Sequence, residues 1–158
     1  MTNTSNMKTI INVFGWADMG KSSSIRLLAE MLGADISGQD WDIKCRIDYK
    51  GHKVGIVSQG DPGYGQEKDI EQAIKDGCDV TVCASRTKGE TVHKVWGLAK
   101  QYNCNLIWTS VCWDDYQMMV LNGVNNEVAA IRRDILNEVS ASDLLKLIDA
   151  IIENEQAF

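Results

Sequence analysis

The sequence predicts an α/β fold of three layers, in which a mostly parallel sheet with one antiparallel edge strand lies between two layers of helices. Short runs rich in Val and Ile alternate along the chain with segments whose apolar residues recur every three or four positions. This alternation is typical of parallel strands joined by helices, because each crossover helix covers one face of the sheet. The 158 residues suit one domain. Residues 1–7 are expected to form a flexible lead.

The first half of the chain is expected to contain three strands and two helices. Lys50-Gly51 reads as a tight turn, so the two runs beside it are predicted to pair as a hairpin, and the first of them supplies the antiparallel edge strand. Gly77 is a natural end for the second helix. The elements are a strand at 10–14, a helix at 25–32, strands at 43–49 and 53–58, and a helix with Ile70, Ala73 and Ile74 on one face.

The second half is expected to contain two more strands and three helices. The runs at 80–84 and 106–111 are apolar, and both are predicted to be buried strands. Residues 112–126 carry no pattern that assigns them. The helices are indicated by apolar residues at helical spacing: Val92, Val95, Trp96 and Ala99 in the first, Val128, Ile131, Ile135 and Val139 in the second, and Leu144, Leu145, Ile148, Ile151 and Ile152 in a third that starts near Ser142.

The most specific motif is the G-x-x-x-x-G-K-S pattern between the first strand and the first helix. Glycines let the backbone turn tightly and present several N–H groups to one anion. Lys21 reaches toward the β and γ phosphates, and the Ser22 hydroxyl can ligate Mg²⁺. The following helix directs its positive N-terminal end at the same place. The residues expected to hold phosphate are Gly15, Trp16, Ala17, Asp18, Met19, Gly20, Lys21, Ser22 and Ser23.

On this motif the chain resembles the P-loop NTPase superfamily. The resemblance implies a P-loop NTPase-like three-layer sandwich that binds a nucleoside triphosphate together with Mg²⁺. It covers most of the chain at the level of the superfamily and identifies no narrower family.

Ligands of open α/β sheets bind beyond the carboxyl ends of the strands, which singles out two further residues. Asp61 follows the strand at 53–58 and resembles the acidic residue that supports Mg²⁺ in P-loop proteins; the alternative is a turn aspartate before Pro62. Arg86 follows the strand at 80–84 and can stabilise charge on a transferring phosphoryl group; the alternative is a solvated basic loop with Lys88. Lys21, Asp61 and Arg86 are the expected catalytic residues, and Ser22 and Asp61 the expected metal ligands.

Three readings of the function stay open. The order of elements is similar to that of small GTPases, and the segment from Asp61 to Gln66 resembles their D-x-x-G-Q switch in its spacing. The guanine-reading N-K-x-D motif is missing after residue 84, where the chain has residues 85–90 instead. ATP is therefore favoured over GTP. A small kinase is the second reading, with an unknown phosphoryl acceptor. The third is a nucleotide-dependent switch whose loops at 59–66 and 85–89 signal to a protein partner.

Aromatic and acidic residues near the motif have open roles. Trp113 can contact a base or pack in the interior, and Trp16 can shield the phosphates or anchor the loop. Asp18 can cap the helix or orient a water. The histidines, His52 and His93, have no nucleophilic partner nearby in the sequence and are expected at the surface.

Composition limits the other classes of partner. The net charge of −6 does not favour polyanions, so nucleic acid is not expected as a partner. No segment has the apolar length of a membrane span, and the N-terminus lacks the apolar core of a signal peptide. Five cysteines without a C-x-x-C spacing argue against a zinc site and favour buried free thiols in a cytoplasmic protein.

Overall fold

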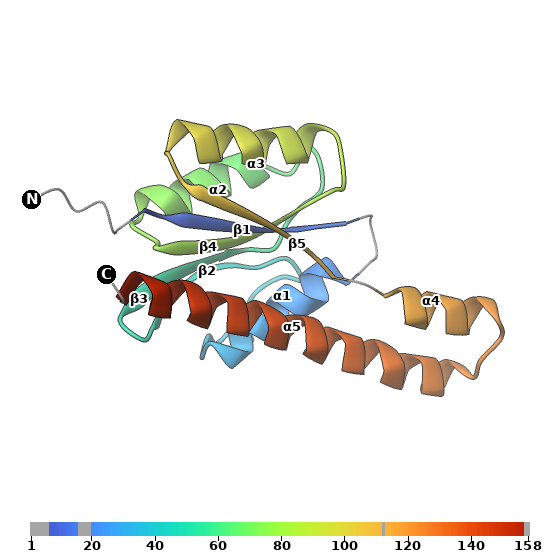
Figure 1. The fold of residues 1–158 in the computed structure, drawn as a ribbon. Coiled ribbons are helices and arrows are strands. Elements are labelled where there is room, and N and C mark those ends of the chain that lie inside the picture. Colours follow the sequence, from blue (N-terminus) through green and yellow to red (C-terminus); the bar gives the residue numbers. More distant parts are fainter. Residues whose placement is uncertain (1–6, 16–19, 112, 157–158) are drawn as a thin grey trace, which may run out of the picture.

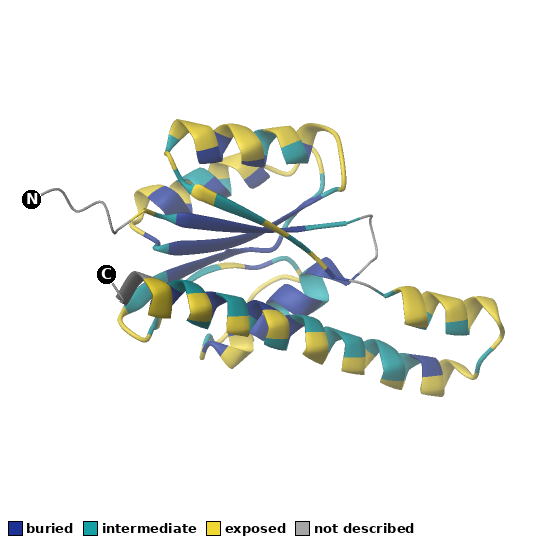
Figure 2. Ribbon diagram, in the orientation of Figure 1, coloured by how far each residue is buried: buried dark blue, intermediate teal, exposed yellow. Residues whose placement is uncertain are grey.

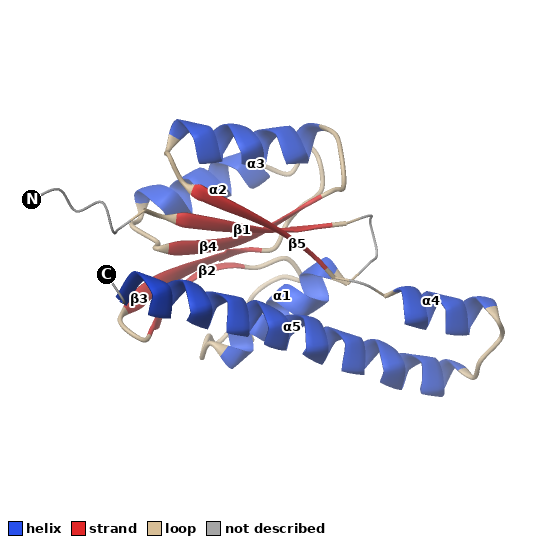
Figure 3. Ribbon diagram, in the orientation of Figure 1, coloured by secondary structure: helices blue, strands red, loops and turns tan. Residues whose placement is uncertain are grey.

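The computed structural model describes residues 7–15, 20–111 and 113–156, which form five strands and five helices (Figures 1 and 3). The described strands form one sheet in the order β2-β3-β4-β1-β5, with β2 antiparallel to β3 and the other pairs parallel. In chain order the elements are β1 (Thr9–Phe14), α1 (Lys21–Met31), β2 (Lys44–Tyr49), β3 (His52–Val57), α2 (Gln66–Lys75), β4 (Val80–Ser85), α3 (Glu90–Gln101), β5 (Asn105–Ser110), α4 (Asp114–Leu121) and α5 (Asn126–Gln156).

The hairpin of β2 and β3 turns at Lys50 and Gly51, whose φ angles are 50° and 79°. A two-residue turn with both φ angles positive matches the twist of the strands that it joins. It pairs Tyr49 with His52 and, five residues further along, Lys44 with Val57. The predicted antiparallel edge strand is therefore confirmed.

Helices cover both faces of the sheet, as Figure 1 shows: α1 and α5 lie on one face, and α2 and α3 on the other. Alternate residues of β1 point into the two cores, with Ile11 and Val13 on the side of α1 and Ile10 on the side of α2 and α3. These side chains are fully buried. The helices on both faces and the three parallel strand pairs together confirm the predicted α/β class and the mostly parallel sheet.

Strand β4 lies between β1 and β3, and this order decides which loops meet. Phe14 at the end of β1 is in register with Ser85 at the end of β4, and Val57 at the end of β3 is in register with Cys83. The segments that follow β1, β3 and β4 therefore leave the sheet side by side. Arg86 lies between the segments that contain Lys21 and Asp61.

The strand predicted at 106–111 is present as β5, but the prediction that it is buried is wrong, because β5 is an edge strand with only β1 as a neighbour in the described sheet. Its side chains are partly or fully exposed along the strand, and Trp108 contacts Phe14 edge to face while 37% of its surface stays exposed. An apolar run of this length does not distinguish a central strand from an edge strand.

The C-terminal region forms one continuous helix, so the prediction of two helices that divide near Ser142 is also wrong. No Gly or Pro lies within α5 to end the helix. Figures 1 and 2 show that its N-terminal part extends beyond the carboxyl ends of the strands, beside α4 and away from the sheet. The four apolar residues whose spacing indicated a helix in this part of the chain are therefore exposed: Val128, Ile131, Ile135 and Val139.

The C-terminal part of α5 packs against the sheet and α1, and Leu144, Ile148 and Ile152 are buried there. Helix α4 occupies part of the segment that the sequence pattern left unassigned. Among the residues that the structure describes, no helix combines the length and the apolar composition that a membrane span requires.

Candidate functional site

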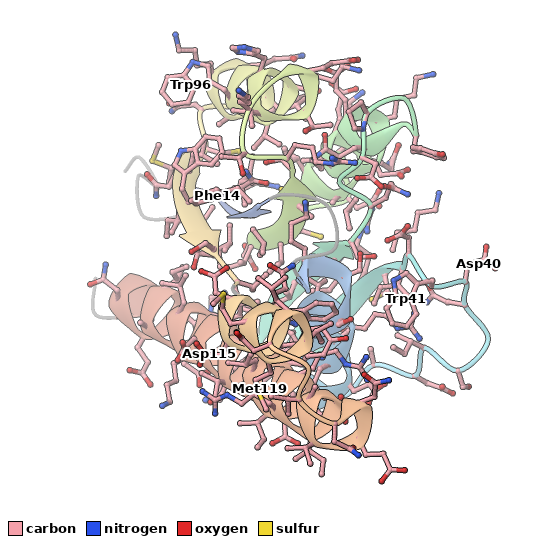
Figure 4. All side chains as sticks on the ribbon, turned by 90° about the vertical axis from the view of Figure 1, so that its right-hand side faces the viewer. Phe14, Asp40, Trp41, Trp96, Asp115 and Met119 are labelled. Carbon is pink, nitrogen blue, oxygen red and sulfur yellow. The ribbon has the colours of Figure 1, made fainter. Side chains whose placement is uncertain are left out.

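A cavity of about 260 Å³ opens at the carboxyl edge of the sheet, in front of the N-terminus of α1. Figure 4 looks onto this edge of the molecule. The cavity is lined by three segments and one further side chain: Gly20 to Ser23, Trp41 and Asp42, Ser58 to Asp61, and Trp113. Gly20, Lys21, Ser22, Ser23 and Asp61 thus line one cavity, whereas Trp16, Ala17, Asp18 and Met19 lie outside the described residues.

Helix α1 begins directly at this cavity. Gly20 has a φ of 89° and, as the N-cap residue, offers no side chain of its own to the first N–H groups of the helix. The side chain of Lys21 is almost fully buried, and its ammonium donates to the carbonyl of Gly15 over 2.6 Å. Lys21 thus reaches the residue that follows β1, and an anion at the helix N-terminus would compete for the same ammonium.

Asp42 is the carboxylate that contacts the expected metal ligand Ser22. The Ser22 hydroxyl donates to Asp42 Oδ1 over 3.0 Å, and the Ser58 hydroxyl lies 3.3 Å from the same oxygen. Gln59 Nε2 donates to Asp42 Oδ2 over 2.8 Å. Both oxygens of Asp42 are thus held by groups on α1 and on the segment after β3. A hydroxyl and a carboxylate are oxygen ligands of the kind that Mg²⁺ prefers.

Asp61 lines the same cavity and forms an ion pair. Its Oδ1 lies 2.8 Å from Nε of Arg86, and both side chains are partly exposed. The amide of Asp61 is bonded to Gln59 Oε1 over 2.8 Å, so Gln59 connects the two acidic residues of the site. The expected metal ligand Asp61 and the expected catalytic Arg86 therefore contact each other in this structure.

Arg86 is positioned by the end of β4. Its amide donates to the hydroxyl of Thr91 at the start of α3 over 3.0 Å, and its carbonyl accepts from the Ser85 hydroxyl over 2.8 Å. Ser85 is buried and also accepts a hydrogen bond from Asn12 in the middle of β1. This buried polar contact ties the start of the Arg86 loop to the strand that leads to the P-loop motif.

Close backbone packing holds the Asp61 segment in place. A Cβ added to Gly60 would lie 2.8 Å from the carbonyl carbon of Ala84, so the segment after β3 passes directly against β4 at this point. The side chain of Gln66, at the start of α2, is buried and donates to the carbonyl of Ala84. Gly60 and Gln66 both fix the entry into the loop that carries Asp61.

Trp113 packs against Gly20, at the start of α1. A Cβ on Gly20 would overlap with the indole ring of Trp113, so only glycine fits at this position. The indole nitrogen donates to Asn137 Oδ1 of α5 over 2.9 Å, and the ring meets Tyr116 edge to face. The sequence allows two roles for Trp113, contact with a nucleotide base or packing in the interior. The structure shows the packing against Gly20, and the ring also lines the cavity.

Other residues that drew attention in the sequence lie elsewhere. Lys88 is exposed in the loop before α3, and His93 is exposed on α3 itself. His52 lies at the start of β3, 3.4 Å from Asp79. Cys78 and Cys83 are buried, and burial raises the pKa of the Cys83 thiol, which makes it unreactive. No cluster of three or more potential metal-binding His, Cys, Asp or Glu side chains occurs among the described residues.

Asp42 is the site residue that the sequence interpretation missed. The sequence favours Asp61, because no other carboxylate lies near the end of β3 along the chain. Asp42 reaches that end through the hairpin, since the two-residue turn at Lys50-Gly51 sets Lys44 opposite Val57. The same register continued by two residues sets Asp42 beside Gln59, which is the hydrogen-bonded pair that the structure contains. The turn length was thus a usable signal.

No protein-family model and no curated protein matches this chain. Among solved structures, a de novo designed PLOOP2X3_50 fold protein, determined by solution NMR, is similar to it. The similarity covers 91% of this chain and 96% of the design, with a TM-score of 0.46 and 15% sequence identity.

Proposed function

We propose that this chain is a P-loop protein that binds a nucleoside triphosphate with Mg²⁺, ATP being favoured, and that it catalyses hydrolysis or transfer of the terminal phosphoryl group. The observation that carries the proposal is the contact of Ser22 with Asp42 at the N-terminus of α1. It combines a G-K-S sequence, a helix N-terminus and a carboxylate in one cavity. Phosphate binds at such helix ends, and a hydroxyl with a carboxylate suits the metal.

The residues of the site have separate roles in this proposal. The N–H groups at the start of α1 and the Lys21 ammonium bind the β and γ phosphates. Ser22 and Asp42 are the residues that would hold Mg²⁺, which when bound neutralises charge on the phosphate oxygens. The Ser58 and Gln59 side chains hold the Asp42 carboxylate in position. Asp61 serves as a second acidic group in the lining of the cavity.

Arg86 is the residue proposed to stabilise the negative charge that develops on the phosphoryl group during its transfer. Its guanidinium is held by Asp61 at the edge of the cavity, and a phosphoryl group in the cavity would compete with Asp61 for it. Adenine is favoured over guanine because residues 85–90 after β4 lack an aspartate in register with the guanine-reading motif.

One contact favours the second candidate, a nucleotide-dependent switch. The Asp61–Arg86 ion pair connects the loop after β3 with the loop after β4. A ligand that draws Arg86 toward its terminal phosphate would separate the two loops, and a protein partner could read that change. Turnover distinguishes the candidates, because a kinase transfers the phosphoryl group to an acceptor whereas a switch hydrolyses slowly and changes its affinity for the partner.

Titration calorimetry of Mg-ATP tests the proposal. Lys21→Ala is expected to abolish binding, whereas Lys68→Ala, a change of an exposed lysine on α2, should bind as the unmodified chain does. A thermal-shift panel of nucleotides with Mg²⁺ then identifies the base, since a ligand at a hundred times its Kd adds about 2.7 kcal/mol of stability. Unchanged affinity in Lys21→Ala would refute the P-loop assignment.

A further inference from the structure

A second pocket, of about 640 Å³, adjoins the phosphate cavity. The two spaces share Ser23, Trp41 and Trp113, so they meet at the first turn of α1. Beyond that turn the second pocket follows one face of α1 and is closed on the other side by α5. We refer to it as the α1–α5 pocket.

The two spaces follow one another along α1, from its N-terminus toward its C-terminus. Ser23, Arg26 and Glu30 are spaced three and four residues apart, so they lie along one face of the helix and lead away from its N-terminus. An anion that binds to the first N–H groups of α1 lies at one end of this path. The remainder of the same ligand has the α1–α5 pocket directly beside it.

From this arrangement we propose that the α1–α5 pocket holds the base and ribose of the nucleotide whose phosphates bind at the N-terminus of α1. The inference rests on the proposed function, because it places the second half of the same ligand.

The charges of the α1–α5 pocket select a nucleoside over a second phosphorylated group. Three carboxylates line it, Glu30, Asp134 and Glu138, against the two guanidinium groups of Arg26 and Arg133. The excess of negative charge disfavours another phosphate, as a phosphorylated acceptor would require. Carboxylate oxygens accept hydrogen bonds, which suits ribose hydroxyls and the amino group of a base.

Trp41 supplies the surface on which the base stacks. It is 62% exposed although it borders both spaces, and Figure 4 shows it at the carboxyl edge of the molecule. The Arg26 guanidinium lies 4.8 Å from the centre of its ring and donates to the carbonyls of Asp40 and Trp41. Arg26 therefore holds this segment against α1. A planar base would cover indole surface that is now in water, which stabilises the complex.

Trp113 connects the base site with the phosphate site. Its indole ring occupies the space over Gly20 and is oriented by the bond to Asn137, which also lines the α1–α5 pocket. Trp113 cannot be removed without changing the packing of the P-loop motif, so Trp41 is the residue for a selective test.

The test compares two ligands by calorimetry, Mg-ATP and inorganic tripolyphosphate with Mg²⁺, which has no base or ribose. The unmodified chain is expected to bind both, and ATP at least tenfold more tightly. Trp41→Ala is expected to lose about tenfold in ATP affinity, in line with one base–aromatic stack, and to keep its affinity for tripolyphosphate. Trp41→Phe retains a ring and is expected to recover most of the loss.

Trp96→Ala is the matched control, because Trp96 is an exposed tryptophan on α3, apart from Trp41 in Figure 4. It should bind both ligands as the unmodified chain does. Equal affinity of the unmodified chain for both ligands, or equal losses for both in Trp41→Ala, would overturn the base site and leave the phosphate site in place. Failure to bind either ligand would overturn the proposed function and the base site together.

Discussion

The hydroxyl of Ser22 and the carboxylate of Asp42 lie 3.0 Å apart, although 20 residues separate them in the sequence. Ser22 is in the first turn of α1, and Asp42 is in the segment that enters the antiparallel strand β2. The contact joins the first turn of α1 to the segment that leads into β2 at the edge of the sheet, and the proposed metal site depends on it.

Asp42→Asn should weaken binding of Mg-ATP by about tenfold or more, because the metal would lose a charged oxygen ligand. Binding of ATP in the presence of a chelator should change little, since the helix N-terminus and Lys21 remain. Calorimetry with and without Mg²⁺ measures both quantities. Asp40→Asn, two residues away and exposed, serves as the control. Equal losses with and without the metal would show that Asp42 only supports the fold of the cavity.

Arg86→Ala should slow phosphoryl transfer or hydrolysis more than it weakens ground-state binding, because its guanidinium is proposed to act on charge that develops in the reaction. Single-turnover rates and the Kd of Mg-ATP give the two effects separately. Lys88→Ala removes an exposed cation from the same loop and should leave both unchanged. Matching losses in rate and affinity would make Arg86 a binding residue.

Gly60→Ala should destabilise the protein by about 1–3 kcal/mol, because the new methyl group would be forced against the backbone of Ala84. Urea unfolding measures the change. Gly97→Ala is the contrasting variant: it lies on α3 with no atom within 4 Å of the added Cβ, and it should stabilise the helix by about 0.5–1 kcal/mol. Similar free energies of unfolding for the two variants would contradict the close approach at Gly60.

The two parts of α5 should respond differently to substitution. Ile148→Ala should cost about 2–5 kcal/mol, because Ile148 is fully buried in the core between α5, α1 and the sheet. Ile131→Gln should change stability by no more than about 0.5 kcal/mol, because 60% of Ile131 is exposed. Thermal unfolding of both variants tests this contrast, and a large loss for Ile131→Gln would mean that this side chain is covered in solution.

Tyr49→Phe should make the free energy of unfolding depend less on pH in the acid range. The Tyr49 hydroxyl donates to Asp149 over 2.7 Å and, together with Lys50, lowers the pKa of that carboxyl from its ordinary value of 3.8. A lowered folded-state pKa stabilises the fold above pH 3.8, and this contribution disappears as the pH falls through the folded-state value. The variant should therefore be about 1 kcal/mol less stable at pH 7, and the difference should shrink in acid.

Carbon-detected NMR titration of Asp149 provides the direct measurement, with an upward shift of its pKa expected in Tyr49→Phe. An unchanged pKa for Asp149 in Tyr49→Phe would show that Lys50 alone lowers the pKa of this carboxyl.

Local sequence determined most of the elements and the G-x-x-x-x-G-K-S pattern, but not α4 or the continuity of α5. The alternation of strands and helices, the turn at Lys50-Gly51 and the glycine before Lys21 depend on neighbours a few residues apart, and those neighbours are visible in the sequence. The tertiary structure decided what depends on distant segments. The order of the strands made β5 an edge, placed Arg86 against Asp61 and brought Asp42 to Ser22.

The same distinction explains α5. The spacing of apolar residues around Ile131 correctly indicates a helix, but it does not indicate whether other elements cover that helix. Spacing reports which side chains share a face, and only the position of the helix relative to the sheet decides whether that face is covered. In this protein α5 extends past the sheet, so one half of the helix contributes to the core, and in the other half, beside α4, Ile131 and the other large apolar side chains of its face stay exposed.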